Sequence, residues 1–251
     1  MNKCYTTTMK YQAIIFDKDG TVLDFNAFWI SVSKGVVNDL IKKFNVNISN
    51  KTFLTAIGVF DETSDPNGVL CKGTYEEIAE IFYNILVNNG VKTTFKEINE
   101  FTLLSFNDNA KNGEIKGTCE NIDEVFLKLK SLNVIIALIT TDNYFITEKC
   151  LKGLKIFEYF DYIYTDDGLV APKPSADAGL NLMEKTGLTK DKILMVGDTV
   201  TDATFAKNAG FDYIGVAKTK ENIDLIKPFA KTVLKDVSYL YNELVKGEEK
   251  C

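Results

Sequence analysis

Short apolar runs without polar alternation recur along this chain, and the first of them, Ala13–Phe16, ends abruptly in turn residues. Runs of this kind are typical of parallel strands that are buried on both faces. We predict such strands at Ala13–Phe16, Val134–Ile139, Tyr162–Tyr164, Lys192–Val196, Tyr213–Val216 and Thr232–Leu234. From residue 118 onward they alternate with helical segments at Asn121–Leu132, Tyr144–Gly153, Ser175–Thr186, Val200–Ala209 and Ser238–Val245. The alternation predicts an α/β fold with a Rossmann-like, doubly wound parallel sheet.

The stretch from residue 25 to residue 110 has a different pattern. Phe28, Val32, Val36 and Leu40 recur at helical spacing, which predicts one long amphipathic helix ending near Phe44. Further helices are predicted at Lys51–Ile57, Tyr75–Asn88 and Lys96–Asn107. We therefore predict a core domain formed by residues 1–24 and 111–251, with a helical domain inserted at residues 25–110.

Composition excludes several kinds of function. The net charge of −6 and the absence of a basic stripe argue against a nucleic-acid surface, which needs clustered positive charge. The chain has no His, and all 29 basic residues are Lys. Imidazole catalysis, His-ligated zinc and Arg forks on phosphate are therefore impossible.

Cysteine spacing and hydropathy bear on the cellular compartment of the protein. The five Cys residues are scattered and have no C-x-x-C spacing, so neither a zinc site nor a disulfide framework is indicated. No apolar run approaches the ~20 residues that cross a membrane. The polar residues 1–10 lack the apolar centre of a signal peptide. We expect a cytoplasmic protein.

Polar residues follow several of the predicted strands. Asp17 and Asp19 follow the first strand in the stretch Asp17-Lys18-Asp19-Gly20-Thr21, which taken alone is also an ordinary turn. Because the carboxyl ends of parallel strands share one edge of a sheet, we expect these polar residues to converge in one pocket. The predicted pocket contains Asp17, Asp19, Thr140, Lys173, Asp198 and Asp202.

Several carboxylates in one pocket repel one another, by about 4 kcal/mol for a pair at ~4 Å and an effective dielectric of ~20. A divalent metal would offset this repulsion, and oxygen ligands without His or thiolate suit Mg²⁺. Some assignments remain open. Thr141 could replace Thr140, Lys149 or Lys152 could replace Lys173, and Asp202 could serve only the N-terminus of a helix.

Taken in order, the stretch Asp17-Lys18-Asp19-Gly20-Thr21, the strand ending in Thr140, the pair Lys173-Pro174 and the stretch Gly197-Asp198-Thr199-Val200-Thr201-Asp202 resemble the four motifs of the haloacid dehalogenase-like hydrolase superfamily. The helical insertion after the first motif resembles the C1 cap of its phosphoglycolate phosphatase and β-phosphoglucomutase branch. Four motifs in the right order are specific where a single one is not.

The resemblance implies a role for each of these residues. Asp17 would attack phosphorus, and Asp19 would act as general acid and then as general base. Thr140 would contact a phosphoryl oxygen, and Lys173 would neutralise developing charge. Mg²⁺ would be bound by Asp17, Asp19 (through its backbone carbonyl), Asp198 and Asp202, the last directly or through water.

The acid at position 19 points to phosphate esters, because dehalogenases and phosphonate-cleaving members of the superfamily lack an acid there. We expect a Mg²⁺-dependent phosphomonoester hydrolase acting on a small phosphorylated metabolite, with phosphoglycolate as the first candidate by resemblance alone. A β-phosphoglucomutase-like mutase, a pyrophosphatase and a nucleotidase of the same family are the alternatives. A mutase would need lysines such as Lys34, Lys51 or Lys72 for a second phosphate. A non-catalytic binding module is disfavoured, because all the chemical groups are present.

Overall fold

The computed structural model describes residues 9–246, which form two compact units. Of these residues, one unit contains 9–24 and 117–246, and the other is Phe25–Lys116. The predicted second boundary at 110/111 is therefore six residues too early (117 − 111 = 6). Residues 111–116 belong to the helical unit because Glu114 donates its backbone N–H to Ser31 Oγ at 2.9 Å. Gly113 also packs so closely on Phe28 that a Cβ would lie 2.5 Å from the ring.

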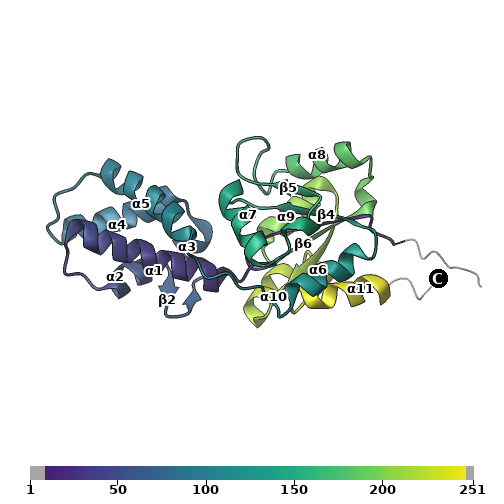
Figure 1. The fold of residues 1–251 in the computed structure, drawn as a ribbon, viewed down its shortest axis with the longest axis horizontal. Helices are drawn as coiled ribbons and strands as arrows, with labels where there is room; N and C mark the ends of the chain where they lie inside the picture. The colour runs from purple at the N-terminus through teal and green to yellow at the C-terminus, as the bar shows by residue number, and fades with distance from the viewer. Residues whose placement is uncertain (1–8, 247–251) are drawn as a thin grey trace, which may run out of the picture. The chain divides into compact units, whose positions relative to one another are not determined.

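The first unit is built on a six-stranded parallel sheet with the order β5-β4-β1-β6-β7-β8 (Figure 1). Its strands are β1 Ala13–Phe16, β4 Ile135–Ile139, β5 Tyr162–Tyr164, β6 Ile193–Gly197, β7 Asp212–Val216 and β8 Thr232–Leu234. In β1 all four residues are buried, as its unbroken apolar run predicts. Phe16 pairs with Leu138 on one side and Val196 on the other, so β1 ends level with both neighbours.

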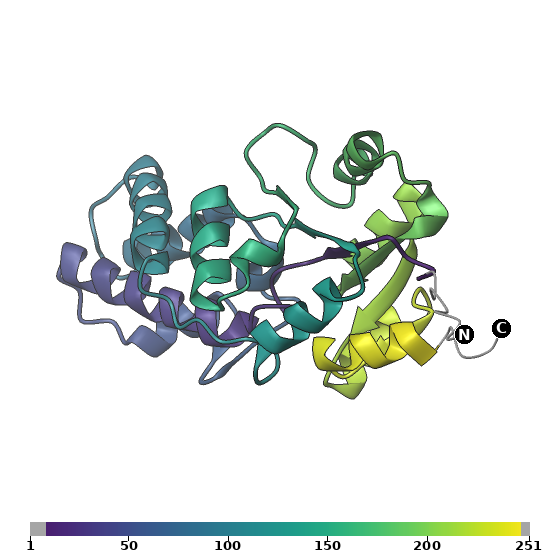
Figure 2. The same ribbon diagram turned by 45° about the vertical axis from the view of Figure 1, so that its right-hand side comes forward.

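Helices cover both faces of this sheet (Figure 2). They are α6 Ile122–Lys130, α7 Tyr144–Gly153, α8 Asp177–Thr186, α9 Val200–Ala209, α10 Lys220–Ile226 and α11 Leu240–Lys246. On one face, Ala13 and Ile15 of β1 join an apolar cluster with Leu182 of α8. On the other face, Phe16 packs against Phe126 of α6 with ring centroids 5.0 Å apart. Successive side chains of a strand point to opposite faces, so β1 is held from both sides.

The helical unit contains α1 Phe25–Phe44, α2 Asn50–Ala56, α3 Val69–Lys72, α4 Tyr75–Asn88 and α5 Phe95–Ala110. Phe53 and Phe82 meet edge-to-face in its core, with ring centroids 5.7 Å apart. Thr74 begins α4 with a capping box to Glu77, as a T-x-x-E sequence predicts. Among residues 9–246, no helix is both long and apolar enough to cross a membrane.

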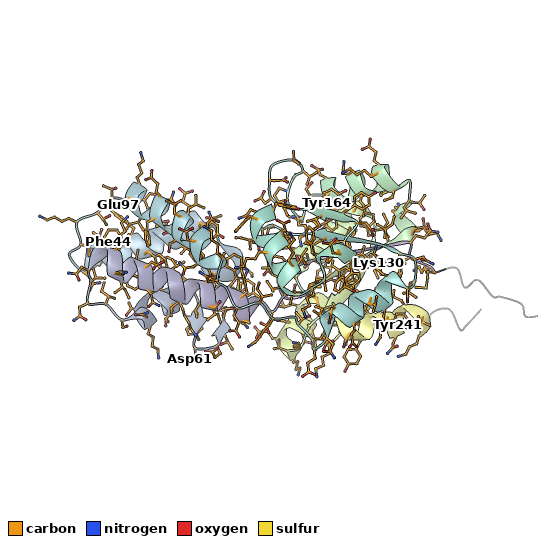
Figure 3. All side chains as sticks on the ribbon, in the orientation of Figure 1. Phe44, Asp61, Glu97, Lys130, Tyr164 and Tyr241 are labelled. Atoms are coloured by element: carbon orange, nitrogen blue, oxygen red, sulfur yellow. The ribbon has the colours of Figure 1, made fainter. Side chains whose placement is uncertain are left out.

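A small hairpin within the helical unit was not predicted from the sequence. Strands β2 Val59–Phe60 and β3 Thr63–Ser64 pair antiparallel around a turn at Asp61 (Figure 3), which has a φ of 53°. Two-residue strands are too short to show a period in the sequence. Gly58, before the hairpin, has a φ of 89°, and a Cβ there would lie 3.0 Å from the Cα of Gly68. The glycine thus serves the packing of this unit.

Candidate active site

Asp17 is the first residue after the central strand β1. Its backbone N–H donates to the carbonyl of Val196 at 2.9 Å, which fixes it beside the end of β6. The side chain is buried, and one of its carboxylate oxygens, Oδ1, forms an ion pair with Nζ of Lys173. The structure thereby joins the first and third sequence motifs.

Lys173 lies on the segment between β5 and α8 and is 4% exposed at its side chain. Its Nζ also lies 2.6 Å from Oδ1 of Asp202, so one buried ammonium group bridges two carboxylates. Lys152, one of the two alternatives, instead pairs with Glu148 at 2.9 Å on the exposed side of α7. Within residues 9–246, Lys173 is the lysine that the structure pairs with Asp17.

Asp198 follows β6 and completes a group of three acidic residues. One carboxylate oxygen from each of Asp17, Asp198 and Asp202 lies within 4.8 Å of the other two. Thr21, from the first motif, donates its hydroxyl to Oδ1 of Asp198 at 3.2 Å. The first and fourth motifs are therefore joined by a hydrogen bond as well as by the strand pairing of β1 with β6.

Asp202 belongs both to a helix N-terminus and to the acidic group. Thr199 caps α9, and its backbone N–H and hydroxyl donate to Oδ2 of Asp202 at 3.1 and 2.6 Å. The other oxygen, Oδ1, accepts from Lys173. Asp202 therefore caps the helix, as the alternative assignment expected, and also contacts Lys173. Both oxygens of the buried Asp202 carboxylate already accept hydrogen bonds.

Two glycines make room for these carboxylates. Gly20 has a φ of 83°, and a Cβ built on it would lie 2.1 Å from Oδ2 of Asp198. At the end of β6, a Cβ on Gly197 would lie 2.5 Å from Cβ of Asp202. A side chain at either place would force the neighbouring carboxylate to move, so both glycines allow the close approach of the acidic residues.

The electrostatics of the group follow from burial and from the excess of negative charge. Burial raises the pKa of Asp17 to about 7, with Asp202 adding to the rise and Lys173 opposing it. Burial, reinforced by Asp17 and Asp202, raises the pKa of Asp198 well above its usual range. The pKa of Lys173 is raised by Asp17 and Asp202, although burial alone would lower it. One ammonium group is therefore too little compensation for three carboxylates.

These residues fit a divalent metal. The donors that converge are oxygen atoms of carboxylates, which Mg²⁺ prefers, and the single ammonium group of Lys173 contacts only two of the three acidic residues. Asp17 and Asp198 are the residues suited to direct binding. Asp202, with both oxygens in use, is suited to orienting Lys173 and the helix end.

Asp19 is not a member of the acidic triad and belongs to a second charged group, which was not predicted from the sequence. Its Oδ2 lies 2.8 Å from Nζ of Lys18, whose side chain is 0% exposed. The same Nζ lies 2.7 Å from Oδ2 of Asp142, which follows β4. The signal in the sequence was a Lys between two acidic residues, directly after a buried strand. Asp142, the second partner of Lys18, is 124 residues away in the chain (142 − 18 = 124) and could not be identified from the sequence.

Thr140 follows β4, the neighbour of β1, and is buried, whereas Thr141 is exposed. The backbone N–H of Thr140 donates to the carbonyl of Tyr164 at 3.0 Å. Its hydroxyl oxygen accepts the backbone N–H of Asp142 at 3.3 Å. Thr140 thus lies at the predicted sheet edge and also helps to shape the turn that carries Asp142.

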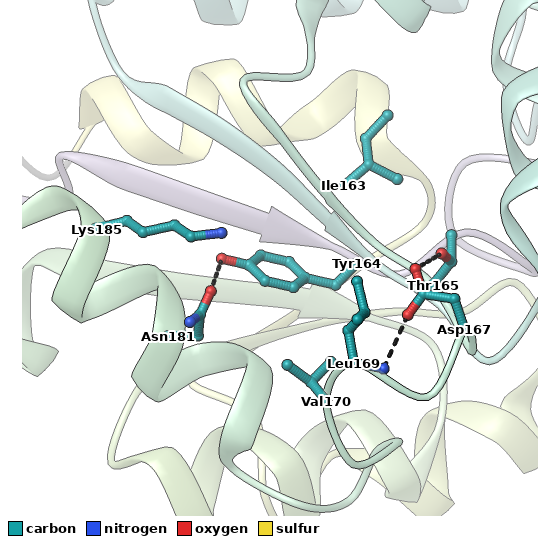
Figure 4. Close-up of a pocket in the computed structure, with 8 residues that line it drawn as sticks. All are labelled: Ile163, Tyr164, Thr165, Asp167, Leu169, Val170, Asn181 and Lys185. Carbon is teal, nitrogen blue, oxygen red and sulfur yellow. Dashed lines mark hydrogen bonds between the residues drawn. The ribbon is translucent and has the colours of Figure 1, made fainter.

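A cavity of about 210 Å³ lies beside the end of β5 and α8 (Figure 4). Its polar groups pair largely with one another, since the hydroxyl of Tyr164 donates to Oδ1 of Asn181 at 3.0 Å. Thr165 likewise donates to Asp167 at 3.2 Å. None of Asp17, Lys173, Asp198 and Asp202 lines this cavity, so it is separate from the acidic group.

Comparison with known families and proteins gives consistent results. Residues 11–210 match the haloacid dehalogenase-like hydrolase family. A protein named pyrophosphatase PpaX from Oceanobacillus iheyensis is 24% identical over 88% of this chain and 90% of its own length. A phosphoglycolate phosphatase from Psychrobacter arcticus is 23% identical over 83% of this chain and 84% of its own.

Solved structures share the fold. A protein described as a β-phosphoglucomutase from Thermotoga maritima superposes with a TM-score of 0.68 and 17% identity, covering 94% of this chain and 99% of its own. The hydrolase YfnB from Bacillus subtilis, solved with bound magnesium, gives a TM-score of 0.65 and 17% identity over 94% and 99% of the two chains.

Proposed function

This chain belongs to the haloacid dehalogenase-like hydrolases and is a phosphatase, and we propose that it hydrolyses small phosphate monoesters with Mg²⁺ through an aspartyl-phosphate intermediate. One observation carries the proposal. The buried carboxylate of Asp17 is ion-paired with Lys173, and one of its oxygens lies within 4.8 Å of carboxylate oxygens of Asp198 and Asp202. This arrangement supports the assignment of Asp17 as nucleophile, of Lys173 as the buried cation beside it, and of the acidic group as the metal site.

In the first step, a carboxylate oxygen of Asp17 forms a bond to phosphorus while the bond from phosphorus to the ester oxygen breaks. The carboxyl group of Asp19 gives a proton to the departing alkoxide. Lys173 neutralises charge that develops on the phosphoryl oxygens, and Thr140 offers them a hydroxyl hydrogen bond. Asp202 keeps Lys173 in position, since its Oδ1 lies 2.6 Å from Nζ.

In the second step, Asp19 takes a proton from a water molecule as that water attacks phosphorus, and the bond to the Asp17 oxygen breaks. Phosphate leaves and Asp17 is restored as a carboxylate. Mg²⁺, when bound by Asp17, Asp198 and the backbone carbonyl of Asp19, would supply the positive charge that screens nucleophile and phosphate from each other. Magnesium in the structure of YfnB, which has the same fold, supports this choice of ion.

We propose a small phosphorylated acid of the phosphoglycolate type as substrate, on the basis of the phosphoglycolate phosphatase from Psychrobacter arcticus. Pyrophosphate is the second candidate, favoured by the likeness to pyrophosphatase PpaX. A phosphomutase needs a second phosphate site. Lys34, one of the lysines named for that task, pairs with the exposed Glu62 at 3.2 Å, and Lys72 contacts the side-chain oxygen of Asn67.

The decisive experiment measures phosphate release from phosphoglycolate, sugar phosphates, nucleoside monophosphates and pyrophosphate, with Mg²⁺ and with chelator. We expect Mg²⁺-dependent release for at least one ester, and a loss of at least about 10⁴-fold in Asp17→Asn, which removes the nucleophile. Purified Asp17→Asn also reports any contaminating phosphatase. Release that persists in this variant, or no release from any ester, would contradict the proposal.

The same panel separates the two substrate candidates. Faster turnover of phosphoglycolate, measured as kcat/KM, supports the monoester proposal. Faster turnover of pyrophosphate selects the alternative, and transfer of the phosphoryl group to a sugar phosphate instead of water would indicate a mutase.

A further inference from the structure

Lys18 is the most deeply buried charged residue of the site, and the mechanism above does not use it. Its side chain is 0% exposed and lies between carboxylate oxygens of Asp19 and Asp142, at 2.8 and 2.7 Å from Nζ. We propose that Lys18, anchored by Asp142, is a positioning residue that holds the carboxyl group of Asp19 in place for proton transfer to the leaving group. This inference rests on the proposed function, in which Asp19 is the acid.

The backbone around Asp19 is already fixed, so the ion pair acts on its side chain. The carbonyl of Lys18 accepts the backbone N–H of Val22 at 2.9 Å and that of Leu23 at 2.8 Å. Gly20 donates its N–H to the carbonyl of Leu23 at 2.8 Å, which closes the turn. Rotation of the Asp19 side chain is the remaining freedom, and the contact with Lys18 restricts it.

Asp142 is a rigid anchor for Lys18. Its backbone N–H donates to the hydroxyl oxygen of Thr140 at 3.3 Å, and its carbonyl accepts the N–H of Asp166 at 2.9 Å. Asp142 is therefore fixed to the turn that carries Thr140, the proposed phosphoryl contact. The proton donor and the phosphoryl contact are linked through one buried lysine.

A purely structural role for Lys18 is the competing explanation. A buried ion pair is a poor source of stability, because well-packed apolar side chains of similar volume often stabilise a protein equally well or better. The two explanations differ in one measurable property. Loss of a positioned acid slows the release of a poor leaving group more than that of a good one, whereas a general disturbance of the site slows both alike.

The test compares wild type, Lys18→Met and Asp142→Asn on two esters with Mg²⁺: p-nitrophenyl phosphate, whose phenolate leaves without a proton, and the fastest alkyl ester of the panel. We expect the Lys18→Met variant to lose about 10–100-fold more kcat/KM on the alkyl ester than on the aryl ester. Asp142→Asn should shift the same ratio in the same direction and by less, because Lys18 keeps its contact with Asp19.

Lys130→Met is the matched control. Lys130 also pairs with an Asp of the same unit, with its Nζ 2.6 Å from Oδ2 of Asp161, but it lies outside the site. Its removal should leave the ratio of the two esters unchanged. An equal loss on both esters in Lys18→Met, or no loss, would overturn the proposal.

Crystal structures of Lys18→Met and Asp142→Asn provide a readout that does not depend on turnover. A displaced Asp19 carboxyl group supports the positioning role, and an unmoved one overturns it. If Lys18→Met does not fold, Asp142→Asn alone decides by the same criteria. Failure of the proposed function would be recognised separately, because wild type would then hydrolyse neither ester and would match Asp17→Asn. The crystal structures would still test the positioning role in that case.

Discussion

Two buried lysines at the end of β1 each bridge two carboxylates, yet the two groups differ in charge and in accessible chemistry. In the Lys173 cluster, formed by Asp17, Lys173, Asp198 and Asp202, the ammonium group bridges Asp17 and Asp202, and Asp198 adds a third carboxylate nearby. In the Lys18 cluster, formed by Lys18, Asp19 and Asp142, two carboxylates share one ammonium group. The first draws on residues after β1, β5 and β6, and the second on residues after β1 and β4.

The different numbers of carboxylates per lysine indicate different roles for Lys173 and Lys18. In the Lys173 cluster, the oxygen atoms of three carboxylates converge, and Lys173 does not neutralise all of their negative charge. Such a group suits a metal ion, which can in turn bind a phosphoryl group. In the Lys18 cluster, the ammonium group itself lies between the carboxylates of Asp19 and Asp142. We infer that one cluster is built for ligands and the other for holding a side chain still.

Among variants that compare the two clusters, we expect the largest loss of turnover in Asp19→Asn, which also separates the two steps of the reaction. In Asp19→Asn, the Lys173 cluster is intact but the acid and base is missing, so turnover should fall by about 10²–10⁴-fold. With p-nitrophenyl phosphate the first step needs no proton, and we expect the phosphorylated protein to accumulate. Rapid acid quenching followed by mass spectrometry would detect one phosphate on Asp17.

Asp17→Asn is the control for this measurement, because it lacks the nucleophile and should remain unphosphorylated. Rapid turnover in Asp19→Asn, without accumulation of the phosphorylated form, would mean that another group performs the proton transfer.

A second prediction concerns the ammonium group of the Lys173 cluster. Lys173→Met removes the buried positive charge beside Asp17, and we expect kcat to fall by about 10²–10³-fold, as for loss of one preorganised electrostatic contact. Lys152→Met is the matched control, because Lys152 pairs with Glu148 on the surface of α7 and should be replaceable without loss. Equal rates in the two variants would exclude Lys173 from the mechanism.

A third prediction uses the pKa of Asp17, which burial raises from 3.8 to about 7 without metal. Because the folded protein then holds a proton that the unfolded chain releases, stability without metal should fall as pH rises from about 4 to about 7. Mg²⁺ binds the ionised carboxylate, so its stabilising effect should be small near pH 5 and larger near pH 8. Thermal unfolding with Mg²⁺ and with chelator would measure the difference in Tm.

In Asp17→Asn the side chain does not titrate, and we expect the dependence of this Mg²⁺ effect on pH to weaken. An equal Mg²⁺ effect at both pH values in wild type would contradict the assignment of Asp17 as a ligand.

The smallest expected effect concerns the space between β6 and α9. In Gly197→Ala the added methyl group would lie 2.5 Å from Cβ of Asp202, so the carboxylate must move away from Lys173 and Thr199. We expect a loss of about 1–3 kcal/mol in the free energy of unfolding, as for other overpacked sites, together with lower kcat. Urea denaturation would measure the first quantity.

Gly187→Ala is a suitable comparison, because Gly187 ends α8 with nothing within 4 Å of a Cβ. It should lose stability through its positive φ of 70° and keep its kcat. Unchanged kcat in Gly197→Ala would show that the position of Asp202 is not critical.

Much of the fold could be predicted from the sequence, because its strands are unbroken apolar runs. Helix Tyr75–Asn88 and strand Thr232–Leu234 have the predicted bounds. The hairpin of β2 and β3 and helix α3 were missed, since strands of two residues and a helix of four carry too little periodicity, and helix α10 was missed as well. The boundary at residue 110 was wrong because helix α5 ends there, while the packing of Gly113 on Phe28 extends the unit to Lys116.

The candidate site divides in the same way. The types of its residues and their positions after predicted strands can be read from the sequence. They were sufficient to predict that Asp17, Lys173, Asp198 and Asp202 lie at one edge of the sheet. The partner of each side chain is a matter of tertiary structure, because residues far apart in the chain meet only through strand order. Pairing of β1 with both β4 and β6 turned Asp17 toward Lys173 and placed Lys18 against Asp142, which no local pattern could specify.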